Sequence, residues 1–193
     1  SPMTPLKPQI AVVLTAITIA VGCRPTIKST PETRALVSSA PAWYNSPPKS
    51  SEYLYSAVTA ESQDMQLAVD KAKAAGRAEL AQQLSVKFEG IAKRFQEESG
   101  LGKQAELVDQ FNQTYKLVVS QEMSGSRMKD QKVLPGEGVY RAYVLMEIPA
   151  GDANKALMAK LSAQDALYAR FRATQAFKEL NDEIERSNKV GKP

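Results

Sequence analysis

Hydrophobic and polar positions repeat along the chain with two different periods. Residues 53–59 are rich in aromatic and branched side chains and predict a strand. Ser62 then offers a helix N-cap, and Asp64 would be favourable in the first turn. From there to about Leu84 a stripe recurs at three- to four-residue spacing, which predicts a helix; it comprises Val69, Ala72, Gly76 and Leu80. Because most side chains of this stripe are small, we expect the helix to pack closely on a sheet.

The next segments return to alternation and then to a helical period. Residues 86–95 alternate between apolar and polar positions with a phase slip at Gly90, which predicts a second strand with a bulge there. Gly100 and Gly102 interrupt the chain. A second helix over residues 104–123 is predicted by four positions spaced by four, four and three: Leu107, Phe111, Tyr115 and Val118.

A hairpin and a long helix complete the pattern. Residues 128–133 and 139–148 read as two strands joined by a Pro-Gly turn, and Pro149 ends the second strand. Asp152 is expected to cap a helix that runs to about Ser187. Its first half presents Leu157, Leu161, Tyr168 and Phe171. The whole predicts an α+β fold: a small antiparallel sheet with helices packed on it, in the order strand, helix, strand, helix, hairpin, helix, with a long C-terminal helix.

The second half of that long helix carries a stripe whose spacing is coiled-coil-like. Its members are spaced by four, three and four: Ala173, Phe177, Leu180 and Ile184. An isolated helix needs a partner surface for such a stripe. The sequence leaves two partners open, a second copy of the chain or the helix's own domain, and we take the stripe as a hypothetical oligomer interface.

The N-terminal pattern indicates export. Lys7 precedes an uncharged, largely apolar run over residues 10–21, too short for a helix that spans a bilayer, which needs about 20 residues. The small residues Ala20-Val21-Gly22 stand at the end of this run, and the next residue is Cys23, the only cysteine. This order is typical of a secretory signal and resembles a bacterial lipobox, in which the cysteine is acylated after cleavage. A plain secretory signal with a chance cysteine is the alternative. Arg24, rather than Asp, follows the cysteine, so we expect sorting to the outer membrane.

Composition divides the chain into four parts. Residues 1–22 are the expected signal peptide, and residues 23–50, rich in Pro and Ser, are an expected extended tether. Residues 51–163 form the expected α+β domain, and residues 164–193 a C-terminal helical extension and tail. Within the tether, Trp43 and Tyr44 form an aromatic island that we expect to dock on the domain.

The residue inventory excludes much enzyme chemistry. Among 193 residues there is no histidine and one cysteine, so the chain alone lacks a Cys/His zinc site, an intramolecular disulfide and a histidine-based nucleophile. The 25 basic residues are interspersed with 21 acidic ones, which argues against nucleic-acid binding. Phosphate-loop and S-x-x-K patterns fail at the positions that their chemistry needs. We therefore predict no catalytic residue, metal or cofactor, and no enzyme activity.

Several segments together resemble a known family. They are the Pro-Ala-Trp-Tyr-Asn-Ser-Pro-Pro stretch over 41–48, the strand at 53–59, the Ala-rich helix with its Arg-Ala-Glu-Leu-Ala run at 77–81, and Gly-Val-Tyr-Arg-Ala-Tyr-Val-Leu-Met-Glu-Ile-Pro over 138–149. These resemble the LPP20 family of bacterial lipoproteins, which includes lipoproteins associated with the flagellar basal disk. The resemblance covers roughly residues 41–157. It implies a compact α+β domain and a lipid-bearing Cys23, and it transfers no other functional residue.

Three classes of function follow. The first is a lipid-anchored outer-membrane lipoprotein with a structural or assembly role, either as a homo-oligomer or in a flagellum-associated or other envelope complex. The second is a periplasmic or surface module that binds a small molecule, glycan or peptide in a groove between helices and sheet. The third, an enzyme that works without histidine, is the least favoured.

Overall fold

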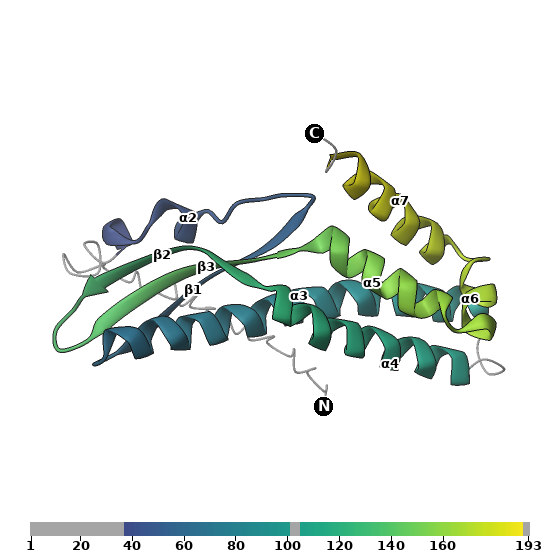
Figure 1. Ribbon diagram of the computed structural model, residues 1–193, viewed down its shortest axis with the longest axis horizontal. Coiled ribbons are helices and arrows are strands. Elements are labelled where there is room, and N and C mark those ends of the chain that lie inside the picture. Colours follow the sequence, from purple (N-terminus) through teal and green to yellow (C-terminus); the bar gives the residue numbers. More distant parts are fainter. Residues whose placement is uncertain (1–36, 101–104, 191–193) are drawn as a thin grey trace, which may run out of the picture. The chain divides into compact units, whose positions relative to one another are not determined.

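The structure, a computed structural model, describes residues 37–100 and 105–190 (Figure 1). Residues from Ser38 onward form one compact unit. The elements of this unit, in chain order, are α2 (Ala42–Asn45), β1 (Tyr53–Ser62), α3 (Met65–Ser99), α4 (Ala105–Glu122), the 3₁₀ turn η1 (Met123–Gly125), β2 (Arg127–Pro135), β3 (Tyr140–Pro149), α5 (Ala150–Ser162), α6 (Asp165–Phe171) and α7 (Gln175–Val190).

The three strands form one antiparallel sheet in the order β1-β3-β2. The predicted hairpin is confirmed: β2 and β3 pair from Pro135 opposite Tyr140, and the turn between them uses Gly138 at a φ of +71°. A bulge interrupts β2 at Lys129. The α+β class predicted from the sequence is therefore confirmed, with β3 as the central strand.

Helix α3 corrects the prediction of a second strand over residues 86–95. The helix runs unbroken from Met65 to Ser99. Its buried positions continue at helical spacing through the segment that seemed to alternate, as Leu84, Phe88, Ile91 and Phe95. No bulge exists at Gly90, which is helical. Phe95 and the residues before it thus extend the stripe of the first half of the helix by nearly three further turns.

The N-cap of α3 is also corrected. Ser62 is the last residue of β1, and Asp64 caps the helix by accepting a hydrogen bond from the Leu67 backbone N–H at 2.7 Å. The helix ends at Gly100, where the sequence predicted a break in the chain, and not near Leu84 as predicted. The φ of Gly100 is +83°, which a residue with a side chain rarely adopts.

The first half of α3 packs on the sheet, as its small stripe predicts. A Cβ built on Gly76 would lie only 2.5 Å from Cγ of Met146 on β3, so the absence of a side chain allows this close approach. The core here is made of small and branched residues on one face of the sheet and the facing helix: Ala68, Val69, Ala72, Leu80, Ala142, Val144, Met146 and Ile148.

The second half of α3 enters a different core, built among helices. Phe95 stacks on Phe111 of α4 with ring centroids 5.5 Å apart, and both rings meet Phe171 of α6 edge-on at 5.8 and 5.2 Å. Leucines of α5 and α7 complete this core; they are Leu157, Leu161 and Leu180.

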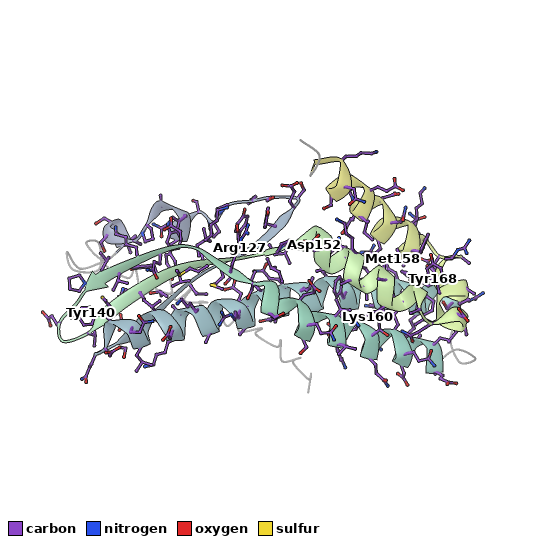
Figure 2. All side chains as sticks on the ribbon, viewed as in Figure 1. Arg127, Tyr140, Asp152, Met158, Lys160 and Tyr168 are labelled. Atoms are coloured by element: carbon purple, nitrogen blue, oxygen red, sulfur yellow. The ribbon has the colours of Figure 1, made fainter. Side chains whose placement is uncertain are left out.

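The long C-terminal helix predicted from Asp152 is wrong in two respects. Pro149 occupies the N-cap of α5, and Asp152 lies exposed in its first turn (Figure 2). The chain then breaks twice, giving α5, α6 and α7. At the second break the Oγ1 atom of Thr174 accepts the Phe177 backbone N–H at 3.2 Å, which caps α7. The breaks turn α7 back onto α3 and α5, which it contacts.

Helix α2 docks on the sheet face opposite α3 (Figure 1). The Tyr44 ring meets Tyr143 of β3 edge-on, with centroids 4.9 Å apart. Lys132 donates a hydrogen bond from Nζ to the carbonyl oxygen of Ser39 at 2.8 Å. The expected docking of the aromatic island is confirmed for Tyr44. Residues 42–45 are helical, although the tether was expected to be extended.

Candidate functional site

One polar cluster lies on the sheet face that carries α2. Glu147 of β3 is only 4% exposed, and its carboxylate accepts hydrogen bonds from Arg127 Nε at 2.7 Å and Lys129 Nζ at 3.1 Å. Lys129 also donates to the Tyr55 hydroxyl at 3.2 Å and lies over that ring. The guanidinium of Arg127 lies 5.7 Å from the ring centre of Tyr53. These contacts join all three strands.

The charges of this cluster are satisfied within it. Burial alone would raise the pKa of Glu147, but hydrogen bonds and the positive charges of Arg127 and Lys129 outweigh burial and hold that pKa below its ordinary value. The same contacts raise the pKa of both cations. Because the carboxylate stays ionised and paired, the cluster is suited to fixing the bulged strand β2 against β3 rather than to proton transfer.

A second polar cluster lines an open pocket of about 550 Å³. The pocket lies between the start of β1, the middle of α3, the first turns of α5 and the last turns of α7. Its lining contains three serines, three cations, one carboxylate, one amide and three residues without a polar side chain: Ser50, Ser51, Leu54, Lys87, Ala150, Gly151, Asn154, Glu183, Arg186, Ser187 and Lys189.

Asn154 is the buried polar residue of this pocket. Its side chain is 3% exposed, and Nδ2 donates to Oε2 of Glu183 at 3.0 Å. The same carboxylate oxygen lies 2.5 Å from Nζ of Lys87, so Glu183 joins α3, α5 and α7. Among the described residues, Oδ1 of Asn154 has no hydrogen-bond partner. A buried acceptor without a donor is uncommon in folded proteins.

The first turn of α5 forms the wall beside Asn154. A Cβ built on Gly151 would overlap the Ser187 side chain, so glycine is what lets α7 approach the start of α5 this closely. Pro149 provides no side-chain cap, and Ala150 donates its N–H to the Glu52 carbonyl oxygen at 2.7 Å. The N–H groups that follow in this turn have no acceptor within the helix, and the helix dipole adds positive potential there.

The lining of the pocket carries an excess of positive charge. Lys87, Arg186 and Lys189 set three positive charges against Glu183, which leaves the lining with a formal charge of +2. Within the part of the chain that the structure describes, no group of His, Cys, Asp and Glu side chains could hold a metal ion. The arrangement offers hydrogen bonds and ion pairing to an anionic group.

The residues that the sequence singled out lie elsewhere. Cys23, the expected lipidation site, lies outside the described residues. The hypothetical oligomer stripe is split: Leu180 is fully buried in the helical core of its own chain, Phe177 and Ile184 pack against that core, and Ala173 is exposed. Three of the four residues therefore contact the helix's own domain, one of the two partners that the sequence left open, because the breaks before α6 and α7 turn the stripe onto α3 and α5. The oligomer interface stays a prediction.

Sequence reasoning missed the pocket, although one signal for it was present. Asn154 stands three and seven residues before Leu157 and Leu161, so it occupies a position on the buried stripe of α5. A polar residue on such a stripe indicates a buried partner. Glu183 and Gly151 carry no such signal, because their roles depend on α7 folding back.

Three further findings bear on membrane attachment and on the family of the chain. In residues 37–100 and 105–190 no helix has the length and apolar character to cross a bilayer. Comparison with curated proteins and with solved structures found no match. The family model of the LPP20 lipoprotein matches residues 41–148, which is more than half of the chain and includes α2, the whole sheet except Pro149, α3 and α4. On this match, and on the α+β fold that it covers, the chain belongs to the LPP20 lipoprotein family.

Proposed function

We propose that this protein is a lipid-anchored lipoprotein of the outer membrane that has a structural or assembly role and no catalytic one. The observation that carries the proposal is membership of a lipoprotein family in a chain whose only cysteine follows a short apolar run and small residues. Two or three acyl chains on Cys23 would hold the protein on a bilayer, since each buried methylene contributes about 0.8 kcal/mol.

The connection between anchor and fold is short. Fourteen residues separate Cys23 from Ser38, where the compact unit begins, and such a segment reaches at most about 50 Å. The chain enters the unit beside α2, which packs on the face of the sheet opposite α3.

An assembly role is supported by what the pocket and the polar cluster lack. Among the described residues Glu147, a carboxylate whose pKa is lowered, is paired with two cations, and the pocket's carboxylate, Glu183, is paired with Lys87. Neither is poised as a general acid or base. Assembly would take place among copies held at the membrane, where anchoring raises the local concentration and weak pairing suffices. A flagellum-associated or other envelope complex is the setting that the family resemblance suggests.

Two substitutions test the anchor separately from its destination. Cys23→Ser should abolish lipidation and release the protein from membranes, as seen by mass spectrometry and cell fractionation. Arg24→Asp should leave the lipid in place but shift the protein toward the inner membrane. Retention of the Cys23→Ser protein in the membrane fraction would overturn the anchor, and an Arg24→Asp protein that fractionates as wild type would overturn the sorting rule for this chain.

The assembly role needs its own measurement. Native mass measurement of the lipidated protein in detergent reports lipid and copy number together. We expect more than one copy or a co-purifying envelope partner. A single lipidated copy with no partner would overturn the assembly role and leave the anchor intact.

A further inference from the structure

We propose that the outer edge of β2 pairs with the same edge of a second copy of the chain. The two strands run antiparallel about a two-fold axis that passes beside Gln131, and the two three-stranded sheets become one sheet of six strands. This inference rests on the proposed assembly role, for which it names the partner and the surface.

The first step of the argument is that the two edges of the sheet differ. In the order β1-β3-β2, both outer strands have an edge without a neighbouring strand. At the β1 edge, α3 packs beneath the strand, and Gln83 donates from Nε2 to the carbonyl oxygen of Tyr55 at 3.0 Å. The β2 edge lies at the margin of the sheet away from α3, and residues 127–132 are all exposed (Figure 1). An exposed edge is a template for pairing with another strand.

The second step is the direction of the backbone groups of β2. Gly136 donates its N–H to the carbonyl oxygen of Val139 at 2.7 Å, which makes a hydrogen-bonded pair at the turn of the hairpin. Because such pairs alternate along an antiparallel ladder, Gln131 and Val133 direct their N–H and C=O groups away from β3. Within residues 37–100 and 105–190, the single partner of these groups is the Asp130 side chain, whose Oδ1 accepts the Gln131 N–H at 2.7 Å. A second strand would supply the missing donors and acceptors.

The third step is the register, which the charges decide. A two-fold axis between identical antiparallel strands places one residue opposite itself. With Gln131 in that place, Asp130 of each copy lies opposite Lys132 of the other, so two unlike charge pairs form. An axis at Asp130 or at Lys132 would instead place like charges opposite each other. Lys132 gives one hydrogen bond to Ser39 and keeps further N–H donors for the pair.

The bulge at Lys129 brings apolar residues together in the same register. If the second copy skips the extra residue as β3 does, Met128 of each copy lies opposite Val133 of the other. Both are on the face that carries α3, because their partners on β3 are Met146 and Ala142 of the sheet core. Met128 is 38% exposed, and pairing would cover it. The strand is therefore complementary to itself in charge, in apolar contacts and in backbone groups.

The symmetry also suits two anchored copies. An axis perpendicular to the sheet keeps α2 of both copies on one face of the joined sheet. Each chain enters its compact unit at Ser38, beside α2, so both tethers start from that face. Two copies on one membrane are held at a high local concentration, at which a short ladder of this kind suffices.

The first experiment reverses the charges in the lipidated protein in detergent. Asp130→Lys and Lys132→Asp each convert both unlike pairs into like pairs, and we expect each to raise the dimer dissociation constant about tenfold or more. Sedimentation and native mass measurement follow the dimer. Mixing the two variants in equal amounts creates a mixed dimer in which both pairs are unlike again, and we expect pairing to return. The double variant should pair like wild type.

Matched controls place the same charge changes on another surface. Asp109→Lys and Lys116→Asp alter exposed residues of α4, and we expect neither to change the dimer. Far-ultraviolet circular dichroism checks that each variant is folded. Recovery on mixing is itself a control, because two misfolded variants would not restore each other.

The second experiment tests the position of the axis. In a hydrogen-bonded antiparallel pair the Cα atoms are about 5.5 Å apart, which a disulfide can span. Acylation would block the Cys23 thiol, so we expect Gln131→Cys to crosslink two copies under mild oxidation. Asp109→Cys should remain uncrosslinked, and wild type reports any crosslink through Cys23.

The outcomes separate the edge from the assembly role. Wild type with several copies whose number ignores the charge variants, or variants that do not recover on mixing, overturns the edge pairing and leaves assembly intact. A single copy bound to an envelope partner does the same. A single copy without a partner overturns both. A dimer of Gln131→Cys that does not crosslink overturns the register.

Discussion

One helix, α3, packs by two different rules along its length. Its first half faces the sheet with small residues, and Gly76 lets Met146 approach where a side chain would collide. Its second half faces other helices with aromatic rings, and Phe95 lies among rings of α4 and α6. The difference shows that residue size follows the partner: a flat strand surface is met at short distance, whereas the wider gaps between helices are filled by large side chains.

The cores on the two halves of α3 also differ in which parts of the chain supply their residues. Residues 41–148, which the family model matches, contain both faces of the sheet core. The helical core also needs residues beyond the family match, because Leu157, Phe171 and Leu180 lie after residue 148 and are fully buried in this core. The helices α5 to α7 therefore contribute buried residues to the helical core of this chain.

The largest effect on stability is expected from charge placed in the helical core. Phe177→Asp with Leu180→Asp would bury carboxylates beside aromatic rings, and we expect loss of cooperative unfolding in the helical half. Circular dichroism during thermal melting measures this. Ala173→Asp, on the same stripe but exposed, should melt as wild type. A double variant that stays folded and only loses copies in sedimentation would restore the stripe as an oligomer interface.

The same substitution at two glycines of α3 tests the difference between its two halves. Gly76→Leu should destabilise the protein by about 1–3 kcal/mol, because the new side chain overlaps Met146 and approaches Val58 within the sheet core. Gly90→Leu has open space around its Cβ and should stabilise by about 0.5–1 kcal/mol through helix propensity. Chemical denaturation gives both values. Equal effects at the two sites would contradict the close approach of α3 to the sheet.

A smaller effect is expected on the face opposite α3. Tyr44→Ala removes the edge-on contact with Tyr143 and should cost about 0.5–1.5 kcal/mol, or a few degrees in melting temperature. Asn45→Ala, exposed in the same short helix, is the control. A Tyr44→Ala protein with an unchanged melting temperature would mean that α2 adds nothing to the stability of the sheet.

The smallest expected effect depends on pH. Because pairing with Arg127 and Lys129 lowers the pKa of Glu147 in the folded state, its contribution to stability is present above the ordinary glutamate pKa. That contribution is lost as the pH falls through the lower folded value. Glu147→Gln should thus be less stable than wild type at neutral pH, and the gap should close in acid. Exposed partners and salt screening keep the gap small.

Urea midpoints over a pH series measure this gap. Glu137→Gln, in the exposed hairpin turn, is the control and should show no such closing. A gap between Glu147→Gln and wild type that widens toward acid would mean that the carboxylate is protonated more easily in the folded state, against the pairing described.

The sequence predicted the elements whose pattern is local. The strand at 53–59, the hairpin and the helix over 104–123 are found, because each is specified by its own alternation or spacing. The segment 86–95 was misassigned because Phe88 and Phe95 fit both periods over so short a window, and only their continuity with Leu84 reveals the helix. The breaks before α6 and α7 contain no proline or glycine, so the sequence did not predict them.

The pocket was beyond the reach of such patterns for a physical reason. It is assembled from four elements that meet only after α7 turns back, so no single segment contains its geometry. Asn154 alone could have been noticed, as a polar residue on an apolar stripe. Its relation to Glu183, twenty-nine positions later, depends on tertiary structure.

The shared helix has a consequence for how the protein opens. Since α3 contributes to both cores, neither core can lose its packing without disturbing the hydrogen-bond ladder on which the other rests. Amide protons near Leu80 and Leu84, where the two cores meet, should therefore exchange with deuterium only through global unfolding, whereas those of α2 and the last turns of α7 exchange through local fraying.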